Sequence, residues 1–145
     1  MPSLHAAIQL AGKTLPKVVS PKHHAAADYG AAALFLLGSA FFWRRNKAAA
    51  TASLICGLAG ASVAALTDYK GGAKHAIGFP LHAKIDLGLS SMAAAIPEIL
   101  TPEDEKAKSF FRIQSLLIAI VAVLTEFELE RTVADEERTE KRRTA

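Results

Sequence analysis

The chain has 145 residues, which is the length of one domain, and 51% of them are apolar, with alanine supplying much of that fraction. The formal net charge is only +3, and no basic stripe is interleaved with aromatic residues, so a nucleic-acid partner is not expected. A single cysteine, Cys56, excludes an intramolecular disulfide and a metal site built from several thiolates.

Four apolar segments follow one another along the chain. Residues 25–43 come first, and residues 48–67 form an uncharged run about as long as a bilayer core requires. Residues 82–100 carry Lys84, Asp86 and Glu98. The fourth segment, 113–125, follows a helix-start pattern in which Thr101 is the expected N-cap and Pro102 the first helical residue.

The pattern of these segments predicts an all-α membrane protein. A soluble bundle would show apolar stripes opposite charged faces, but the first two segments have no charged face beyond Asp28. We therefore expect a four-transmembrane-helix bundle over residues 23–125, built from two tandem repeated helical hairpins at about 21–79 and 80–125. Residues 1–22 are the expected interfacial segment, and residues 126–145 a charged helical tail that continues the fourth helix.

A short motif occurs twice, about sixty residues apart, and each copy opens an apolar segment. The first copy reads His24-x-x-x-Asp28-x-Gly30 and the second His82-x-x-x-Asp86-x-Gly88. An i, i+4 spacing places imidazole and carboxylate on one helix face. Alternating helix direction brings both pairs to the end of the bundle where Asp68 and Glu126 close the other two helices. Ionisable residues within apolar helices indicate a functional site.

Imidazole and carboxylate groups together predict a metal site. His24, Asp28, His82 and Asp86 are the expected ligands of zinc, iron or manganese, and Asp68 is the candidate catalytic base or bridging ligand. The competing interpretation is that each pair is a structural ion pair near a helix N-terminus, with Asp68 an ordinary turn residue. His23 and His75 lie off the repeated pattern, and we expect no role for them.

The order of motifs also resembles a known family. The first segment starts with Pro-x-x-His-x-x-x-Asp, the second ends with Leu66-Thr67-Asp68-Tyr69, and the third starts with Phe79-Pro80-Leu81-His82. This order of motifs resembles that of small bacterial membrane proteins of the SPW-repeat type. The places that match their Ser-Pro-Trp signature here contain Ser39 and Pro97 without the complete triplet. The resemblance covers about residues 21–100 and implies two tandem two-helix units; it implies no activity.

Three functions remain open from the sequence. The first is a metal-binding membrane protein, with or without metal-dependent activity on a small-molecule or lipid substrate. The second is a b-type haem or electron-transfer bundle with His24 and His82 as axial ligands. The third is a non-catalytic homo-oligomer or a proton or ion pathway. In each case the partner is the lipid bilayer, with a bacterial inner membrane expected and a slight excess of lysine and arginine placing the termini in the cytoplasm.

Overall fold

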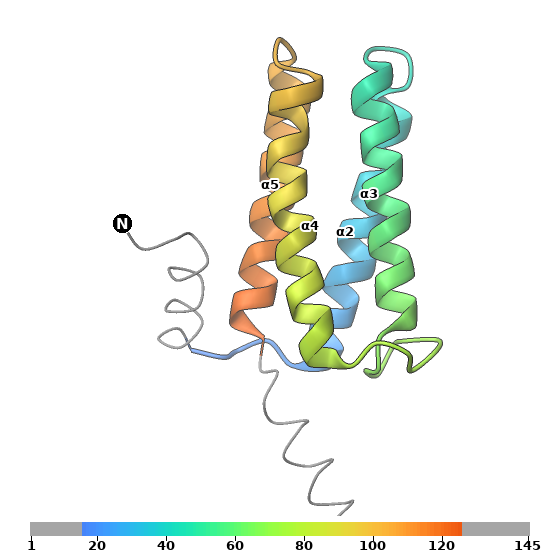
Figure 1. Ribbon diagram of the computed structural model, residues 1–145, viewed down its shortest axis with the longest axis vertical. Helices are drawn as coiled ribbons and strands as arrows, with labels where there is room; N and C mark the ends of the chain where they lie inside the picture. Colours follow the sequence, from blue (N-terminus) through green and yellow to red (C-terminus); the bar gives the residue numbers. More distant parts are fainter. Residues whose placement is uncertain (1–15, 126–145) are drawn as a thin grey trace, which may run out of the picture.

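The computed structural model describes residues 16–125, which form four helices and no strand (Figure 1). The helices are α2 (Pro21–Phe42), α3 (Lys47–Leu66), α4 (Phe79–Leu100) and α5 (Glu105–Leu124). The all-α prediction is confirmed. The expected segment 1–22 lies largely outside the described residues and the tail 126–145 entirely so.

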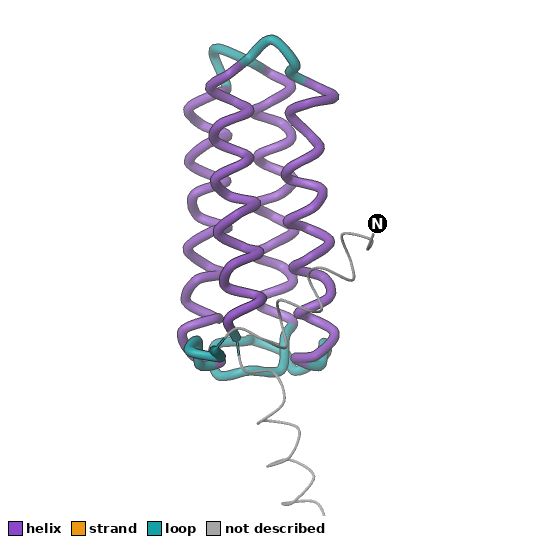
Figure 2. The backbone as a smooth tube through the Cα atoms, turned by 90° about the vertical axis from the view of Figure 1, so that its left-hand side faces the viewer, coloured by secondary structure: helices purple, strands orange, loops and turns teal. Residues whose placement is uncertain are grey.

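The helices run up and down as two hairpins that stand side by side (Figures 1 and 2). Helix α2 packs mainly on α3 and α4 mainly on α5, while contacts of α2 with α5 and of α3 with α4 join the hairpins. Short turns close the hairpins at one end of the bundle. The starts of α2 and α4, the ends of α3 and α5, and the 67–78 connection all lie at the other end, as the alternation of direction predicts.

The hairpins make equivalent contacts at positions that differ by 58 residues, the separation of His24 from His82. An isolated bridge joins Val19 to Thr125, and the corresponding bridge joins Ile77 to Thr67. In each case the segment before one hairpin pairs with the last residue of the other hairpin. These bridges fasten the starts of α2 and α4 to the ends of α5 and α3.

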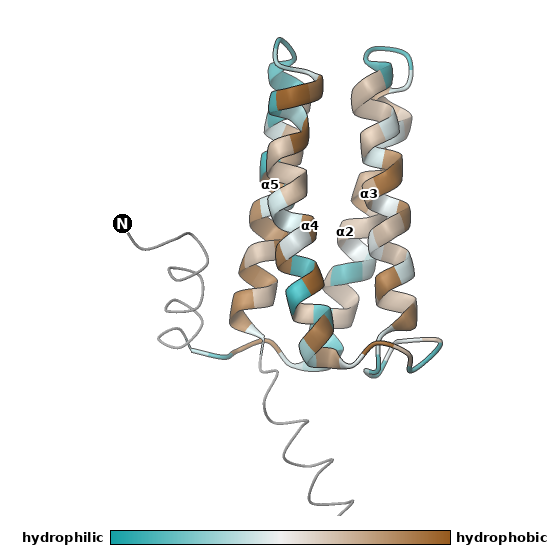
Figure 3. Ribbon diagram, in the orientation of Figure 1, coloured by the Kyte–Doolittle hydropathy of each residue, from teal (hydrophilic) through white to brown (hydrophobic). Residues whose placement is uncertain are grey.

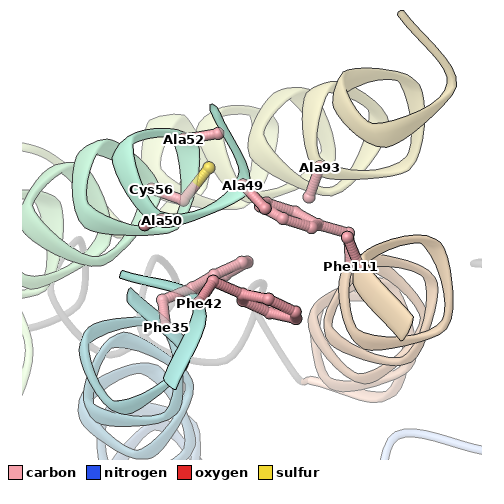
Figure 4. Close-up of a cluster of buried hydrophobic side chains, with 9 residues drawn as sticks. Phe35, Phe42, Ala49, Ala50, Ala52, Cys56, Ala93 and Phe111 are labelled. Atoms are coloured by element: carbon pink, nitrogen blue, oxygen red, sulfur yellow. The ribbon is translucent and has the colours of Figure 1, made fainter. Parts of the chain in front are cut away.

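Small residues allow the helices to approach closely in the half of the bundle near the short turns. Phe35, Phe42 and Phe111 pack there against the alanine face of α3 and against Ala93 of α4 (Figure 4). Inside this cluster the Ser53 hydroxyl donates to the Phe35 carbonyl at 2.6 Å, so the buried hydroxyl is satisfied.

Apolar residues occur along most of the length of the four helices (Figure 3), and many of their large side chains are exposed. Helices α2, α3 and α5 are long and apolar enough to cross a membrane, and only 33%, 39% and 28% of their most apolar windows are buried. Leu37, Ile99 and Leu116 are among the large exposed side chains. Most of the apolar surface of these helices therefore faces outward. Helix α4, with its three charged residues, is not among these three spans.

The predicted start of the fourth helix is wrong by three residues. Thr101 is the C-cap of α4, and its hydroxyl donates to the Pro97 carbonyl at 3.2 Å. Asp104 caps α5, because its Oδ1 accepts from the backbone amides of Lys106 and Ala107. These hydrogen bonds hold the pKa of the Asp104 carboxyl below its usual range, the contact from Ala107 contributing most. An ionised carboxylate is a strong N-cap, which explains the shift.

The substitution Gly38→Ala tests the close packing between the two hairpins. A Cβ added there would lie 2.3 Å from Cζ of Phe110, whose ring is held edge-on by Phe35 and Phe42. Because that ring has little room to move, Gly38→Ala should lower the stability by about 1–3 kcal/mol. Gly30→Ala is the control, since nothing lies within 4 Å of its added Cβ. Melting curves in detergent measure the difference, and equal melting temperatures would contradict this packing.

Candidate metal centre

Two helix starts position the four predicted ligands. Helix α2 begins at Pro21 behind the Ser20 N-cap, and α4 begins at Phe79 with proline in its first turn. Proline suits this position because its fixed φ is helical and the missing amide would have no helical partner. His24 and His82 lie in these first turns, and Asp28 and Asp86 lie one turn further along the same faces.

The four side chains meet inside the bundle. His24 and His82 are 0% and 1% exposed, and Asp86 is 5% exposed. One ligand atom from each residue can be chosen so that all four lie within 4.8 Å of one another. The sequence prediction that both His–Asp pairs converge is therefore correct.

The separations between nitrogen and oxygen atoms are short and similar. Nε2 of His24 lies 3.2 Å from Nε2 of His82, and both nitrogens lie 3.0 Å from Oδ2 of Asp86. The Asp28 carboxylate spans the other side, with Oδ2 at 3.1 Å from His82 Nε2 and Oδ1 at 3.4 Å from His24 Nε2. Each imidazole thus faces the other imidazole and both carboxylates through its Nε2 atom.

The hydroxyl of Thr67 fixes the tautomer of His82. Thr67 Oγ1 donates its only proton to the Val63 carbonyl at 2.6 Å. The same oxygen lies 2.7 Å from His82 Nδ1, so in this hydrogen bond it can only accept. His82 therefore carries a proton on Nδ1, and a neutral ring has a lone pair on Nε2.

His24 is held in the same way by the other hairpin. Thr125 Oγ1 donates to the Val121 carbonyl at 2.6 Å and accepts from His24 Nδ1 at 2.6 Å. Each threonine is the C-cap of its helix and lies at 0% exposure. Each hairpin thus supplies one His–Asp pair and the threonine that orients the histidine of the other hairpin.

Tyr69 supplies a further hydrogen bond to the group. Its hydroxyl donates to Asp28 Oδ2 at 2.8 Å. Burial, followed by the negative charge of Asp28, holds the pKa of the Tyr69 phenol well above its usual range, so the phenol stays protonated and remains a donor. The position 58 residues later is Phe127 in the sequence, which has no hydroxyl.

Aromatic rings close the site at the end of the bundle. The Phe79 ring meets the His24 ring edge-on at 5.4 Å, and the Tyr69 ring packs on His82 at a centroid distance of 5.4 Å. Phe79 and Tyr69 also pack on each other at 5.6 Å. These buried rings cover the imidazoles at this end of the bundle.

The structure places the other sequence-predicted residues outside this group. Asp68 is mostly exposed and pairs with Nδ1 of His75 at 2.6 Å, so the candidate base does not point at the four ligands. Its side chain is exposed, whereas that of the neighbouring Thr67 is buried. His23 is exposed and hydrogen-bonds to Ser20, while Glu126 lies outside the described residues.

No role in the site was assigned from the sequence to the two threonines or to Tyr69. A signal for the threonines was present, because Thr67 and Thr125 are separated by the same 58 residues as the two histidines. The pairs Leu66-Thr67 and Leu124-Thr125 repeat alongside the His–Asp motif. Aligning the two halves at this fixed offset would have identified both threonines as part of the pattern.

Comparisons with known proteins add no family to this picture. No family model matches the chain, and no curated protein or solved structure is significantly similar to it. The functional conclusion therefore depends on the geometry of the four ligands and their surroundings.

Thr67→Val tests the role of the threonines in the site. Valine keeps the branched shape but leaves the buried Nδ1–H of His82 without its acceptor, which should lower stability by about 1–3 kcal/mol. Thr67→Ser should restore most of the loss because serine keeps the hydroxyl. Thr51→Val, at an exposed position of α3, is the matched control. Thermal melting compares them, and equal effects of valine and serine at position 67 would contradict the assignment.

Proposed function

We propose that this chain is a small integral membrane protein that binds one divalent metal ion between His24, Asp28, His82 and Asp86. The observation that carries the proposal is the convergence of two imidazole Nε2 atoms and two carboxylates at one buried point, with all four ligand atoms within 4.8 Å of one another. In the metal-bound state both imidazoles would be neutral and protonated on Nδ1, so that two nitrogen lone pairs and two carboxylates would face the ion. Acceptors repel one another in a medium of low dielectric constant unless a cation lies between them.

The separations suit a single ion. Zinc is bound by histidine nitrogen and carboxylate oxygen at about 2.0–2.2 Å, and a tetrahedron with such bonds has edges of roughly 3.3 Å. Five separations of 3.0–3.4 Å between the nitrogen and oxygen atoms are close to such edges, two of them to different oxygens of Asp28. This spacing supports the binding of a single ion among the four side chains.

Charge and ligand type narrow the choice of ion. Two aspartates and two neutral histidines carry a charge of −2, which a divalent cation balances within an apolar bundle. Two nitrogen and two oxygen ligands suit zinc, iron or manganese, as the sequence predicted. The hydrogen bonds from His24 and His82 to the threonines, and from Tyr69 to Asp28, are the outer contacts that commonly orient metal ligands.

The exposed apolar surface supports insertion of the bundle in a lipid bilayer. We propose that α4 crosses together with α2, α3 and α5, because His82 and Asp86 are buried against the other helices rather than exposed to lipid. Lys47 Nζ lies 4.2 Å from the centroid of the Trp43 ring. We propose that these two residues anchor the end of the bundle with the short turns at one membrane interface. The metal site then lies near the opposite interface, and the slight excess of lysine and arginine on that side favours the cytoplasm.

The structure bears differently on two other functions that the sequence left open, haem ligation and a proton or ion pathway. Haem ligation by His24 and His82 is disfavoured, because their Nε2 atoms lie 3.2 Å apart and the two carboxylates flank them, which leaves no space for a porphyrin ring. A proton or ion pathway stays open, because two protons on the imidazoles would balance the carboxylates as well as a divalent ion does. Metal content separates these two possibilities.

Removal of one histidine should abolish most metal binding. The protein is purified in detergent after growth with added zinc, iron and manganese, and the bound metal per chain is measured. His24→Ala and His82→Ala should each lose most of the metal, and the double variant should lose little more, because both residues belong to one site. Restoration of metal by added imidazole would distinguish a missing ligand from a misfolded bundle.

Two exposed positions provide controls for this experiment. His23→Ala removes a neighbouring imidazole, and Asp68→Asn removes the exposed carboxylate; both should retain parental metal content and melting temperature. The metal proposal is rejected if the parent contains no stoichiometric metal, or if both ligand variants keep it. The pairs would then be charge-balanced by protons.

Membrane integration is tested separately. Because the outward faces of α2, α3 and α5 are apolar, the full chain should remain in the pellet when membranes are washed with alkaline carbonate. A peripheral membrane protein of known behaviour, released by the same wash, is the control. Recovery of the chain as a monodisperse species without detergent would show that the apolar surface has another partner.

A further inference from the structure

We infer that the proposed metal centre has an open face inside the bundle that accepts a small uncharged ligand of two or three atoms. This inference depends on the proposed metal site and extends it by naming the class of molecule that the site takes. It is based on a cavity of about 30 Å³ that is lined by both Asp28 and Asp86.

The cavity lies between the metal ligands and the aromatic core. The remaining wall comes from all four helices, namely Ala31, Ala32, Phe35, Cys56, Gly60, Leu89 and Ile118. The wall includes both carboxylates but neither imidazole. An ion held by the four ligands would therefore meet the cavity on its carboxylate side, while the two histidines and their threonines occupy the other side.

The volume and lining of the cavity limit what can enter. A water molecule needs roughly 10–15 Å³ measured in this way, so the cavity has room for about two water-sized centres. Apart from Asp28, Asp86 and Cys56, the described residues that line the cavity have apolar side chains or none. Water, dioxygen and nitric oxide fit this space.

Charge favours a neutral ligand over an anion. Two carboxylates and a divalent ion sum to zero, so an added anion would leave a net negative charge in an apolar interior. Burying an uncompensated charge is costly, and no cationic side chain lines the cavity. A neutral diatomic molecule or water avoids this penalty.

The space arises from a difference between the two hairpins. Ala31 and Gly60 of the first hairpin correspond, at the offset of 58 residues, to the bulkier Leu89 and Ile118 of the second. All four line the cavity, and all are half-buried. A Cβ added to Gly60 would have Ala32 Cβ as its nearest neighbour, at 3.8 Å, so a side chain can begin there without a clash. The small residues thus leave room that larger ones would fill.

Gly60→Ile places at position 60 the residue that the second hairpin has, and its added carbons should fill the cavity. The full-length protein in detergent is loaded with cobalt(II), because a site that takes zinc or iron also takes cobalt. Nitric oxide is then titrated without oxygen. The visible spectrum and electron paramagnetic resonance of cobalt report binding, and cobalt per chain is measured in the same samples. Gly30→Ile is the matched control, at an exposed glycine of α2.

We expect nitric oxide to alter the cobalt signals of the parent and of Gly30→Ile, and to bind at least tenfold more weakly to Gly60→Ile with unchanged cobalt content. Azide should bind the parent more weakly than nitric oxide. Unaltered nitric oxide binding by Gly60→Ile, equal binding of azide, or a parent that holds cobalt without responding to nitric oxide would overturn the open-face inference and leave the metal site intact. A parent that holds no metal would overturn both.

Discussion

Two imidazoles and two carboxylates held within 4.8 Å of one another in an apolar bundle are the constraint on which the rest of this structure depends. Two carboxylates repel each other in a low dielectric, so the group needs compensating positive charge, from protons or from a cation, and rigid support behind it. The support is local: helix starts fix the histidines and aspartates, and the C-cap threonines fix the imidazole tautomers. A divalent ion satisfies the arrangement with no net charge.

The two ends of the bundle differ in the side chains that fill them. Near the short turns, Phe35, Phe42 and Phe111 fill the space that the alanines of α3 leave, which lets the helices pack closely. At the other end, polar groups replace the aromatic core, and every one of them depends on a partner from another helix. The close packing of the first half holds the helices in the register that the second half requires.

The two hairpins contribute equivalent residues to the four-residue site, but the residues around the site differ between them. The offset of 58 residues relates the histidines, the aspartates and the threonines of the two hairpins. The differences are concentrated around the centre: Tyr69 corresponds to Phe127, and Gly60 to Ile118. Equivalent residues form the proposed metal site, while among the unequal ones Tyr69 hydrogen-bonds to Asp28 and Gly60 lines the cavity.

The sequence by itself determined the helices and the pairing of His24 with Asp28 and of His82 with Asp86, because helical periodicity and i, i+4 spacing are local properties. It also determined that both pairs share one end of the bundle, since four alternating helices permit little else. The repeat at an offset of 58 residues includes Thr67 and Thr125, but only the tertiary structure decided that their hydroxyls, rather than the carboxylate of Asp68, face the histidines. Neighbouring residues at a helix end point in different directions, and which one faces inward depends on how each helix is rotated about its axis against the others. That rotation is set by packing between hairpins, which no local pattern encodes.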